Sequence, residues 1–372
     1  MLLSWTSRCL LRPLALSRWS ARRSVMDLHA VVSHLNALAP PGLAESWDNV
    51  GLLVEPSPPH VVHKLLLTND LTEDVLEEAI VLGADMVLSY HPPIFKPLKR
   101  LTCGNWKERL VVKALEKRLA VYSPHTAYDA LRDGVNDWLG RAIGPCVSSP
   151  LRASSSLSHP GGRVHVVEFS ADLSESLVER VRCLQGVRLR SFTVREDGQD
   201  RTRVRLSCSQ NALQQVMAVL EEDARVYSGV ELLSLQKPPL TDTGMGRLCI
   251  LTQTVSVATA VERVKAHLGL NHLRLALGRG KTLDSPVSSV AVCAGSGSSV
   301  LSGVSADLYL TGEMSHHDVL DAVAEGRSVI LSEHSNSERG FLKDLRGKIA
   351  ERLEGKVQVT VSQSDRDPLE VV

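Results

Sequence analysis

The chain has 372 residues, and its 42 basic residues (Lys and Arg) balance 42 acidic ones, so the formal net charge is zero. Residues 1–25 hold five of the arginines and no acid, which leaves 37 basic against 42 acidic residues in the rest, a net charge of −5. A mildly acidic body argues against non-specific nucleic-acid binding through phosphate attraction. No run approaches the roughly 20 apolar residues of a membrane-spanning helix, so we expect no membrane partner.

Residues 1–25 are rich in Arg, Ser and Leu, a composition typical of a mitochondrial transit peptide. Arg12 and Pro13 interrupt the apolar stretch, which disfavours a secretory signal. The alternative is a leader with no targeting role. Met26 stands directly before the first amphipathic stretch, so a second start there would give a cytosolic or nuclear form of the protein.

The cysteines are far apart and none forms a CxxC pair, which disfavours a zinc ribbon or a secreted disulfide framework. We expect reduced, mostly buried thiols. The seven residues are Cys9, Cys103, Cys146, Cys183, Cys208, Cys249 and Cys293.

Residues 26–145 predict a first α/β half. The apolar spacing over 28–38 predicts a helix, which Pro40 ends. Short apolar strands then alternate with amphipathic helices, and such alternation is typical of a parallel sheet covered by helices. The strands are expected at 65–67, 85–89 and 119–123. The helices are expected at 72–82, with Thr72 as the N-cap, and at 106–117.

A Ser/Pro/Gly-rich linker is predicted at 146–162, and a second linker at 237–246. Between them, residues 163–236 show the order β-α-β-β-α-β, which predicts an inserted ferredoxin-like domain. Strands and helices alternate again over 247–372, the predicted second half. We therefore predict an α/β fold of two halves that share one metal-site domain and carry an inserted βαββαβ domain.

The two halves resemble each other locally. Residues 84–91 (ADMVLSYH) and 306–313 (ADLYLTGE) share the pattern A-D-x-x-L-[ST]-x-[HE]. Further on, His125 is followed four residues later by Asp129, and His334 is followed four residues later by Glu338. The recurrence of both features in the same order predicts a pseudo-repeat.

These polar residues predict a metal centre, because ligands gather at the carboxyl ends of parallel strands. Imidazole and carboxylate ligands suit Zn, Fe or Mn. Two such sets facing each other would hold a pair of ions about 3.5–4 Å apart. A single His-x-x-x-acid pair has a simpler alternative, a pair on a helix surface. The residues expected at the strand ends are His91, His125, Asp129, Glu313, His334 and Glu338.

Three further segments stand out in the sequence. The Gly-rich turn at 294–299 favours either an anion cradle or a tight turn that needs glycine. The segment 278–282 is no phosphate-binding loop, because Leu275 stands where that motif requires glycine. Trp47 and Asp48 are expected to anchor the N-terminal helix in the core.

Four sequence motifs together carry a family resemblance: WDNVGL at 47–52, YHPPIF at 90–95, SPHTAYD at 123–129 and HSNSERG at 334–340. From about Asp27 to Val372 the chain resembles the Nif-three-like family, also labelled "GTP cyclohydrolase I type 2-like", and is most similar to its animal members. We do not transfer that label as an activity.

The resemblance implies two α/β halves with a dinuclear metal site at their interface, an inserted ferredoxin-like domain, and assembly as dimers or toroidal hexamers. The cofactor would be one or two divalent ions per subunit (Zn, Fe, Mn or Mg). The implied ligands are His91, Asp129, His334 and Glu338. Tyr90 stands where the family often has a second histidine. It is kept as a candidate ligand, although a neutral phenol binds metal weakly.

Two functions from different classes follow. The first is a metal-dependent hydrolase of a small phosphorylated or nucleotide-like substrate, in which His125 or Glu313 moves protons. The second is a non-catalytic partner of a transcriptional co-regulator (a co-repressor partner), since the family takes its name from such an association. A third possibility is metal trafficking. Direct nucleic-acid binding is not expected.

Overall fold

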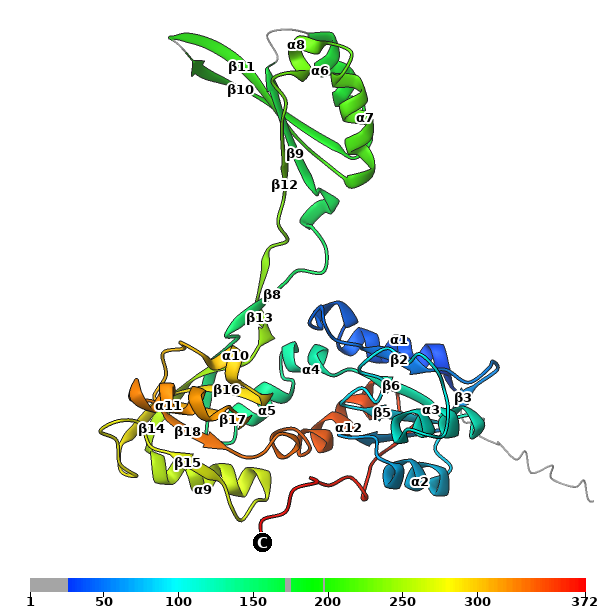
Figure 1. The fold of residues 1–372 in the computed structure, drawn as a ribbon. Helices are drawn as coiled ribbons and strands as arrows, with labels where there is room; N and C mark the ends of the chain where they lie inside the picture. The colour runs from blue at the N-terminus through cyan, green and yellow to red at the C-terminus, as the bar shows by residue number, and fades with distance from the viewer. Residues whose placement is uncertain (1–25, 171–174, 197) are drawn as a thin grey trace, which may run out of the picture.

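The computed structural model describes residues 26–170, 175–196 and 198–372, so the predicted leader at 1–25 lies outside it. The protein has a mixed α/β fold with several sheets. Two of them, with their helices, form a base, and a four-stranded sheet stands away from the base on a two-stranded ribbon (Figure 1). No helix in the described ranges combines the length and apolarity needed to cross a membrane.

The first sheet has the strand order β19-β4-β5-β6-β2, with β19 to β6 parallel and β2 antiparallel to β6. Its strands are β2 (Gly51–Val54), β4 (Lys64–Thr68), β5 (Met86–Ser89), β6 (Ala120–Ser123) and β19 (Gln358–Val361). Around it lie α1 (Leu28–Leu38), η1 (Pro41–Leu43), α2 (Glu73–Leu82), α3 (Trp106–Glu116), α12 (Phe341–Arg352) and a small pair of strands, β1 (Met26–Asp27) and β3 (Val61–Val62).

The continuous apolar run of β4 is explained by burial on both faces of the sheet. Leu66 belongs to the core with α2 and α3, whereas Leu65 and Leu67 belong to the core with α1 and α12. The predicted N-cap of α2 is confirmed, because the Thr72 side chain accepts a hydrogen bond from the backbone N–H of Val75.

The second sheet has the order β15-β18-β17-β16-β14-β7, in which β16, β17 and β18 are parallel and the other pairs antiparallel. Its strands are β7 (Cys146–Ser149), β14 (Arg247–Ser256), β15 (Arg274–Ala276), β16 (Pro286–Ser296), β17 (Leu308–Glu313) and β18 (Ser328–Leu331). The nearby helices are α4 (Thr126–Ala130), α5 (Val135–Gly140), α9 (Val257–Leu268), α10 (Ser298–Leu301), α11 (His316–Ala324) and η3 (Ser335–Ser337).

One hydrophobic core joins the two sheets. It contains Leu88 of the first sheet, Leu310 of the second, and Trp138 and Phe341 from the helices α5 and α12. Each sheet also takes a strand from the far part of the chain: β19 completes the first sheet beside β4, and β7 completes the second beside β14. The two sheets are therefore interlocked.

Residues 165–234 form a separate unit with its own core. Its antiparallel sheet has the order β10-β11-β9-β12. Its elements are β9 (His165–Ser170), α6 (Glu175–Arg182), β10 (Val187–Glu196), β11 (Gln199–Cys208), α7 (Gln210–Leu220), α8 (Ala224–Tyr227) and β12 (Glu231–Ser234).

The ribbon that carries this unit consists of β8 (Arg152–Ser155) and β13 (Pro239–Met245), and η2 (Pro160–Gly162) follows β8. The segments predicted as linkers, 146–162 and 237–246, thus contain β7, β8 and β13. An exposed ribbon needs no alternation of apolar and polar residues, so its composition resembles that of a linker.

Arg247, at the base of this ribbon, binds through its side chain to residues of the first half. Its side chain is only 1% exposed and lies 3.0 Å from the Asp137 carboxylate. The guanidinium also donates to the backbone oxygens of Gly244 and Gly246 and to that of Leu131 at the end of α4. Since α4 carries Asp129, this buried cation also supports the predicted site.

We expect Arg247→Met to lower the free energy of unfolding by about 3 kcal/mol, because it leaves the buried Asp137 carboxylate without its cation and removes a donor from several backbone carbonyls. Urea unfolding followed by circular dichroism measures the change. Arg346→Met, on the exposed side of α12, is the matched control and should change stability little. Equal stabilities of the two variants would contradict the role of Arg247.

Candidate metal centre

The predicted ligands follow strand ends from both sheets. His91 follows β5, and Asp129 lies in α4 shortly after β6. From the second sheet, Glu313 ends β17, and His334 and Glu338 flank η3 after β18. The interlocked sheets bring these ends together.

Three of these side chains form a compact group. One potential ligand atom from each of His91, His334 and Glu338 lies within 4.8 Å of the other two. The Glu338 carboxylate is 3.3 Å from His91 Nε2 and 3.5 Å from His334 Nε2. The first half therefore supplies one imidazole, and the second half supplies the other imidazole and the carboxylate.

Each imidazole is oriented by a carboxylate on its other nitrogen. His91 Nδ1 lies 2.9 Å from Asp70 Oδ1, and His334 Nδ1 lies 2.8 Å from Glu313 Oε1. Both Nε2 atoms are thereby directed towards Glu338. This carboxylate–histidine arrangement is typical of metal-binding histidines, because it fixes the tautomer and the ring plane.

Two observations show that this group fits a divalent ion. His91 Nε2 is buried and, although it lies 3.3 Å from the Glu338 carboxylate, it makes no well-aligned hydrogen bond with any described residue. In addition, a Cβ atom at Gly295 would come within 2.6 Å of the Glu338 carboxylate and 2.9 Å of His334 Nε2, so glycine keeps this side of the group open. Two imidazoles and a carboxylate are a ligand set that suits Zn, Fe or Mn.

The electrostatics of the group favour a cation. Burial by itself would raise the pKa of Glu338, but His91, His334 and a hydrogen bond from Asn69 hold it below its usual value. Burial would lower the pKa of His91, yet Glu338 and Asp70 hold it well above its usual value. Positive charge is stabilised here, either as a proton or as a metal ion.

Asp129 and Tyr90 are paired with each other. The Tyr90 hydroxyl donates to Asp129 Oδ1; Tyr90 is buried and Asp129 is half-buried. Burial raises the pKa of Asp129 to about 6, and burial together with Asp129 holds the pKa of Tyr90 well above its usual value. Neither belongs to the compact group of three, so as metal ligands they stay predictions.

His125 stands next to this group. Its ring centroid is 5.2 Å from that of His91, and its Nδ1 is 2.7 Å from the buried Asp48 carboxylate. Its backbone has a φ of 34°, an uncommon conformation for a side chain with a Cβ. The Asp48 carboxylate also accepts hydrogen bonds from Thr126, which helps to hold this turn.

Several residues of the site were missed or misplaced by the sequence patterns. Asn69 and Asp70 directly follow β4, so the strand-end rule applied to the other ligands would have found them. Trp47 was expected in the core, which is wrong: it is 58% exposed. Asp48 is buried as expected, but its partner is His125.

The Gly-rich turn at 294–299 needs glycine because other parts of the protein pack closely against its backbone. The backbone N–H groups of Ala294, Gly295 and Gly297 already donate to oxygens of the protein. A Cβ at Gly297 would lie 2.3 Å from the Thr311 hydroxyl. The tight-turn alternative therefore holds, and these three amides are not available to an anion.

A cavity of about 320 Å³ opens beside the ligands. His125, Asp129, His334 and Glu338 line its inner wall, and Trp47 and Phe95 stand at it with ring centroids 6.0 Å apart. Arg152 of the ribbon strand β8 also lines it. The cavity thus combines potential metal ligands, a paired histidine, aromatic surface and a cation.

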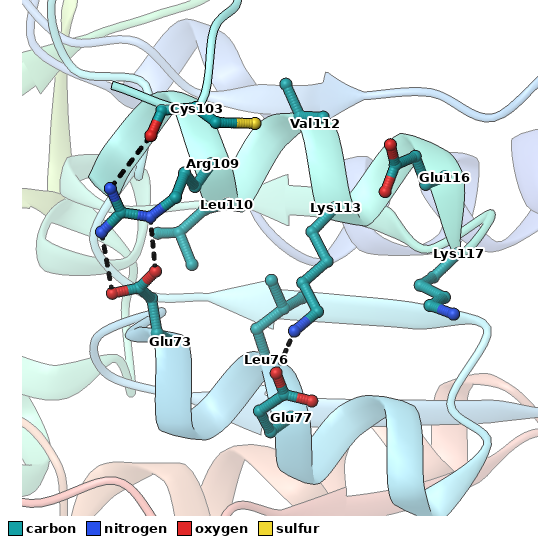
Figure 2. Close-up of a pocket in the computed structure, with 10 residues that line it drawn as sticks. All are labelled: Glu73, Leu76, Glu77, Cys103, Arg109, Leu110, Val112, Lys113, Glu116 and Lys117. Carbon is teal, nitrogen blue, oxygen red and sulfur yellow. Dashed lines mark hydrogen bonds and ion pairs between the residues drawn. The ribbon is translucent and has the colours of Figure 1, made fainter. Parts of the chain in front are cut away.

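Figure 2 shows a different hollow of about 260 Å³, between α2 and α3. Four of its charged side chains are already paired across the helices, Arg109 with Glu73 and Lys113 with Glu77. It contains none of the predicted site residues. We interpret it as a helix contact held by solvent-exposed ion pairs, which contribute little to stability.

The sequence pattern of the Duf34/NIF3 (NGG1p interacting factor 3) family matches residues 26–368. The chain belongs to this family. NIF3-like protein 1 of Rattus norvegicus is 58% identical over 356 residues, 95% of each chain, and NGG1-interacting factor 3 of Saccharomyces cerevisiae is 31% identical over 345 residues, 88% of this chain and 90% of its own.

Among solved structures, a Bacillus cereus protein related to NIF3 superposes with a TM-score of 0.65 over 93% of this chain and 99% of its own, at 24% identity. This likeness shows that the fold is that of NIF3 family proteins. The resemblance predicted from the four sequence motifs is confirmed.

For this NIF3 family protein we expect His334→Ala combined with Glu338→Gln to abolish binding of Zn²⁺ or Mn²⁺, because two of the three clustered ligands are lost. Metal content after loading and desalting, measured by plasma mass spectrometry, is the readout. His317→Ala, on α11, is the control and should retain metal. Full metal content in the double variant would contradict the assignment.

Metal affinity should also fall as the pH is lowered. A histidine must be neutral to bind metal, and the raised pKa of His91 means that a proton competes for this site in the metal-free chain. Titration of the wild-type protein with Zn²⁺ at several pH values measures this competition. An affinity that rises with acidification would contradict it.

Proposed function

We propose that this NIF3 family protein is a divalent-metal-dependent hydrolase of a small phosphorylated or nucleotide-like molecule. The observation that carries the proposal is a cavity lined by His125, His334 and Glu338. His334 and Glu338 belong to the compact group with His91, and His125 is paired with Asp48. Ligands for a cation and a positioned acid/base in one cavity are what hydrolysis requires.

The residues divide the chemistry among them. A divalent ion held by His91, His334 and Glu338 would supply Lewis acidity for the attack of water. With Nδ1 engaged by Asp48, His125 exchanges protons at Nε2. Glu313, the other predicted acid/base, instead orients His334 through Nδ1. The geometry therefore favours His125 as the proton carrier and Glu313 as a positioning residue.

The cavity walls support the substrate class. Trp47 and Phe95 are 58% and 42% exposed at the cavity, so their rings are available to stack on a planar group such as a nucleobase. Arg152 adds a guanidinium, a side chain suited to phosphate. We infer a substrate that carries both a ring and a phosphate.

We also infer that the two halves are a pseudo-repeat around this site, and the two aspartates of the A-D pattern support it. Asp85 accepts from the backbone N–H groups of His63 and Lys64, and Asp307 accepts from those of Ser288 and Ser289. Each aspartate thus accepts hydrogen bonds from the first part of the neighbouring parallel strand, Asp85 from that of β4 and Asp307 from that of β16. The strand order β10-β11-β9-β12 likewise supports the ferredoxin-like insert.

We expect His125→Gln to lower kcat at least about 100-fold while metal content stays that of the wild type, because a proton carrier is lost and the ligands are not. The assay is hydrolysis of a panel of phosphoesters and nucleotides by metal-loaded protein. His29→Gln, an exposed histidine of α1, is the control and should keep full activity.

A second variant tests the ring-binding wall. Trp47→Ala should raise KM for nucleotides more than for small phosphoesters without a ring. If the metal-loaded wild type hydrolyses no compound of the panel, the enzyme proposal is wrong.

A second function is favoured by the name of the yeast relative, NGG1-interacting factor 3, which refers to a protein partner. In that case the protein is a partner of a transcriptional co-regulator and its metal is structural. Capture of the co-regulator should then be unchanged by His125→Gln and lost when the metal-site double variant unfolds. Capture equal to wild type by a folded, metal-free double variant would separate partner binding from the metal.

We further propose a mitochondrial location if the leader acts, and a cytoplasmic and nuclear one if translation starts at Met26. The family match begins at residue 26, which supports a separate role for the leader. Mass spectrometry of the mature N-terminus tests this, and an intact Met1 on mitochondrial protein would contradict cleavage. Assembly as a dimer or hexamer is likewise proposed, and light scattering after size exclusion measures it.

A further inference from the structure

The charges of the inserted unit are strongly segregated. Residues 163–236 contain ten arginines, no lysine and eleven acidic residues, so the sum is close to neutral. On the unit's sheet, however, arginines dominate the two neighbouring strands β10 and β11. Net charge therefore hides a basic surface.

The alternation of side chains places these arginines on the open face of the sheet. Leu189, Val204 and Leu206 belong to the core shared with α6 and α7, so their neighbours along each strand face the other way. The helices cover one side of the sheet (Figure 1). The open face pairs Arg188 with Ser207, Arg190 with Arg205, and Phe192 with Arg203 across β10 and β11.

Part of this positive charge has no counter-charge. Arg205 lies 3.5 Å from Glu168, and Arg203 lies 2.9 Å from Glu231. For the side chains of Arg163, Arg188 and Arg190 the structure shows no ion pair or hydrogen bond within its described ranges. Arg190 moreover stands directly opposite Arg205, and like charges in that position are unfavourable.

The arginines surround a hollow. A depression of about 220 Å³ is lined by Arg163, Arg188, Arg190 and Arg205, together with Val166 and Ser207. Beside it, in the same row of β10, the ring of Phe192 is 40% exposed. A guanidinium cluster that is only partly compensated, next to an exposed aromatic ring, offers contacts to phosphates and to a base.

We propose that the open face of the β10-β11-β9-β12 sheet binds single-stranded nucleic acid, with phosphates on Arg188 and Arg190 and a base stacked on Phe192. Guanidinium groups bind phosphate through two parallel hydrogen bonds, and aromatic rings on an open sheet stack unpaired bases. From the net negative charge of the chain after residue 25 we expected no direct nucleic-acid binding. That argument does not apply to this face, where the charge is positive. The proposal is independent of the metal centre, since the face lies on the inserted unit (Figure 1).

The test is fluorescence anisotropy of the full chain with labelled 12-nucleotide oligo(U) and oligo(dT) from 50 to 200 mM salt. Arg188→Gln with Arg190→Gln should weaken binding about tenfold or more and reduce the slope of log affinity against log salt by about 1.4, since each phosphate contact contributes about 0.7. Phe192→Ala should weaken binding several-fold with the slope unchanged.

The matched control is Arg182→Gln with Arg225→Gln, which removes the same charge from the helices α6 and α8 and should leave affinity unchanged. Circular dichroism confirms the fold of every variant. Equal weakening by the control pair, or no binding by the wild type at 50 mM salt, would overturn the proposal. Competition by poly-glutamate or inorganic phosphate as effective as that by unlabelled oligonucleotide would also overturn it.

Discussion

The buried carboxylate of Glu338 is the constraint on which the site depends. A charged group that is 3% exposed must be compensated, and here the compensation comes from His91 of one half and His334 of the other. The two sheets must therefore meet at their carboxyl ends. The exchange of β7 and β19 between the halves holds them in this position, and the single core around Trp138 fills the space between them.

The residues around the Glu338 carboxylate are themselves held in position by further hydrogen bonds. Asn69 donates to Glu338, and its own backbone N–H donates to Asp365 near the end of the chain. Asp70 and Glu313 orient the imidazoles, and Asp48 orients His125. Such supporting contacts give a site its precision, since a ligand that swings freely binds metal poorly. The site therefore belongs to the whole chain and not to either half.

The sequence predicted the parts of the molecule that follow local rules. The alternating strands and helices, the N-cap at Thr72 and the strand-end placement of His91 and His334 depend on neighbours along the chain. The pairing of Asp48 with His125 joins residues 77 positions apart, and that of Arg247 with Asp137 joins residues 110 positions apart, so no local pattern encodes either pair. The sequence did not predict the ribbon strands β8 and β13, because an exposed pair of strands needs no apolar residues by which a pattern could identify it. The sequence did not predict the basic face of the β10-β11-β9-β12 sheet either, because a net charge summed over many residues does not show where the charges lie.

The strand β19 has a consequence for how the protein is made. Because Gln358–Val361 completes the first sheet beside β4, that sheet lacks its edge strand until long after β4 itself has been synthesised. Glu338 and Asp365 are also synthesised only after the inserted unit. The inserted unit, whose strands and core come from one continuous segment, is able to fold during synthesis. The base is completed only by residues that follow the insert, so a translation product truncated before Glu338 would carry a folded insert and no metal centre.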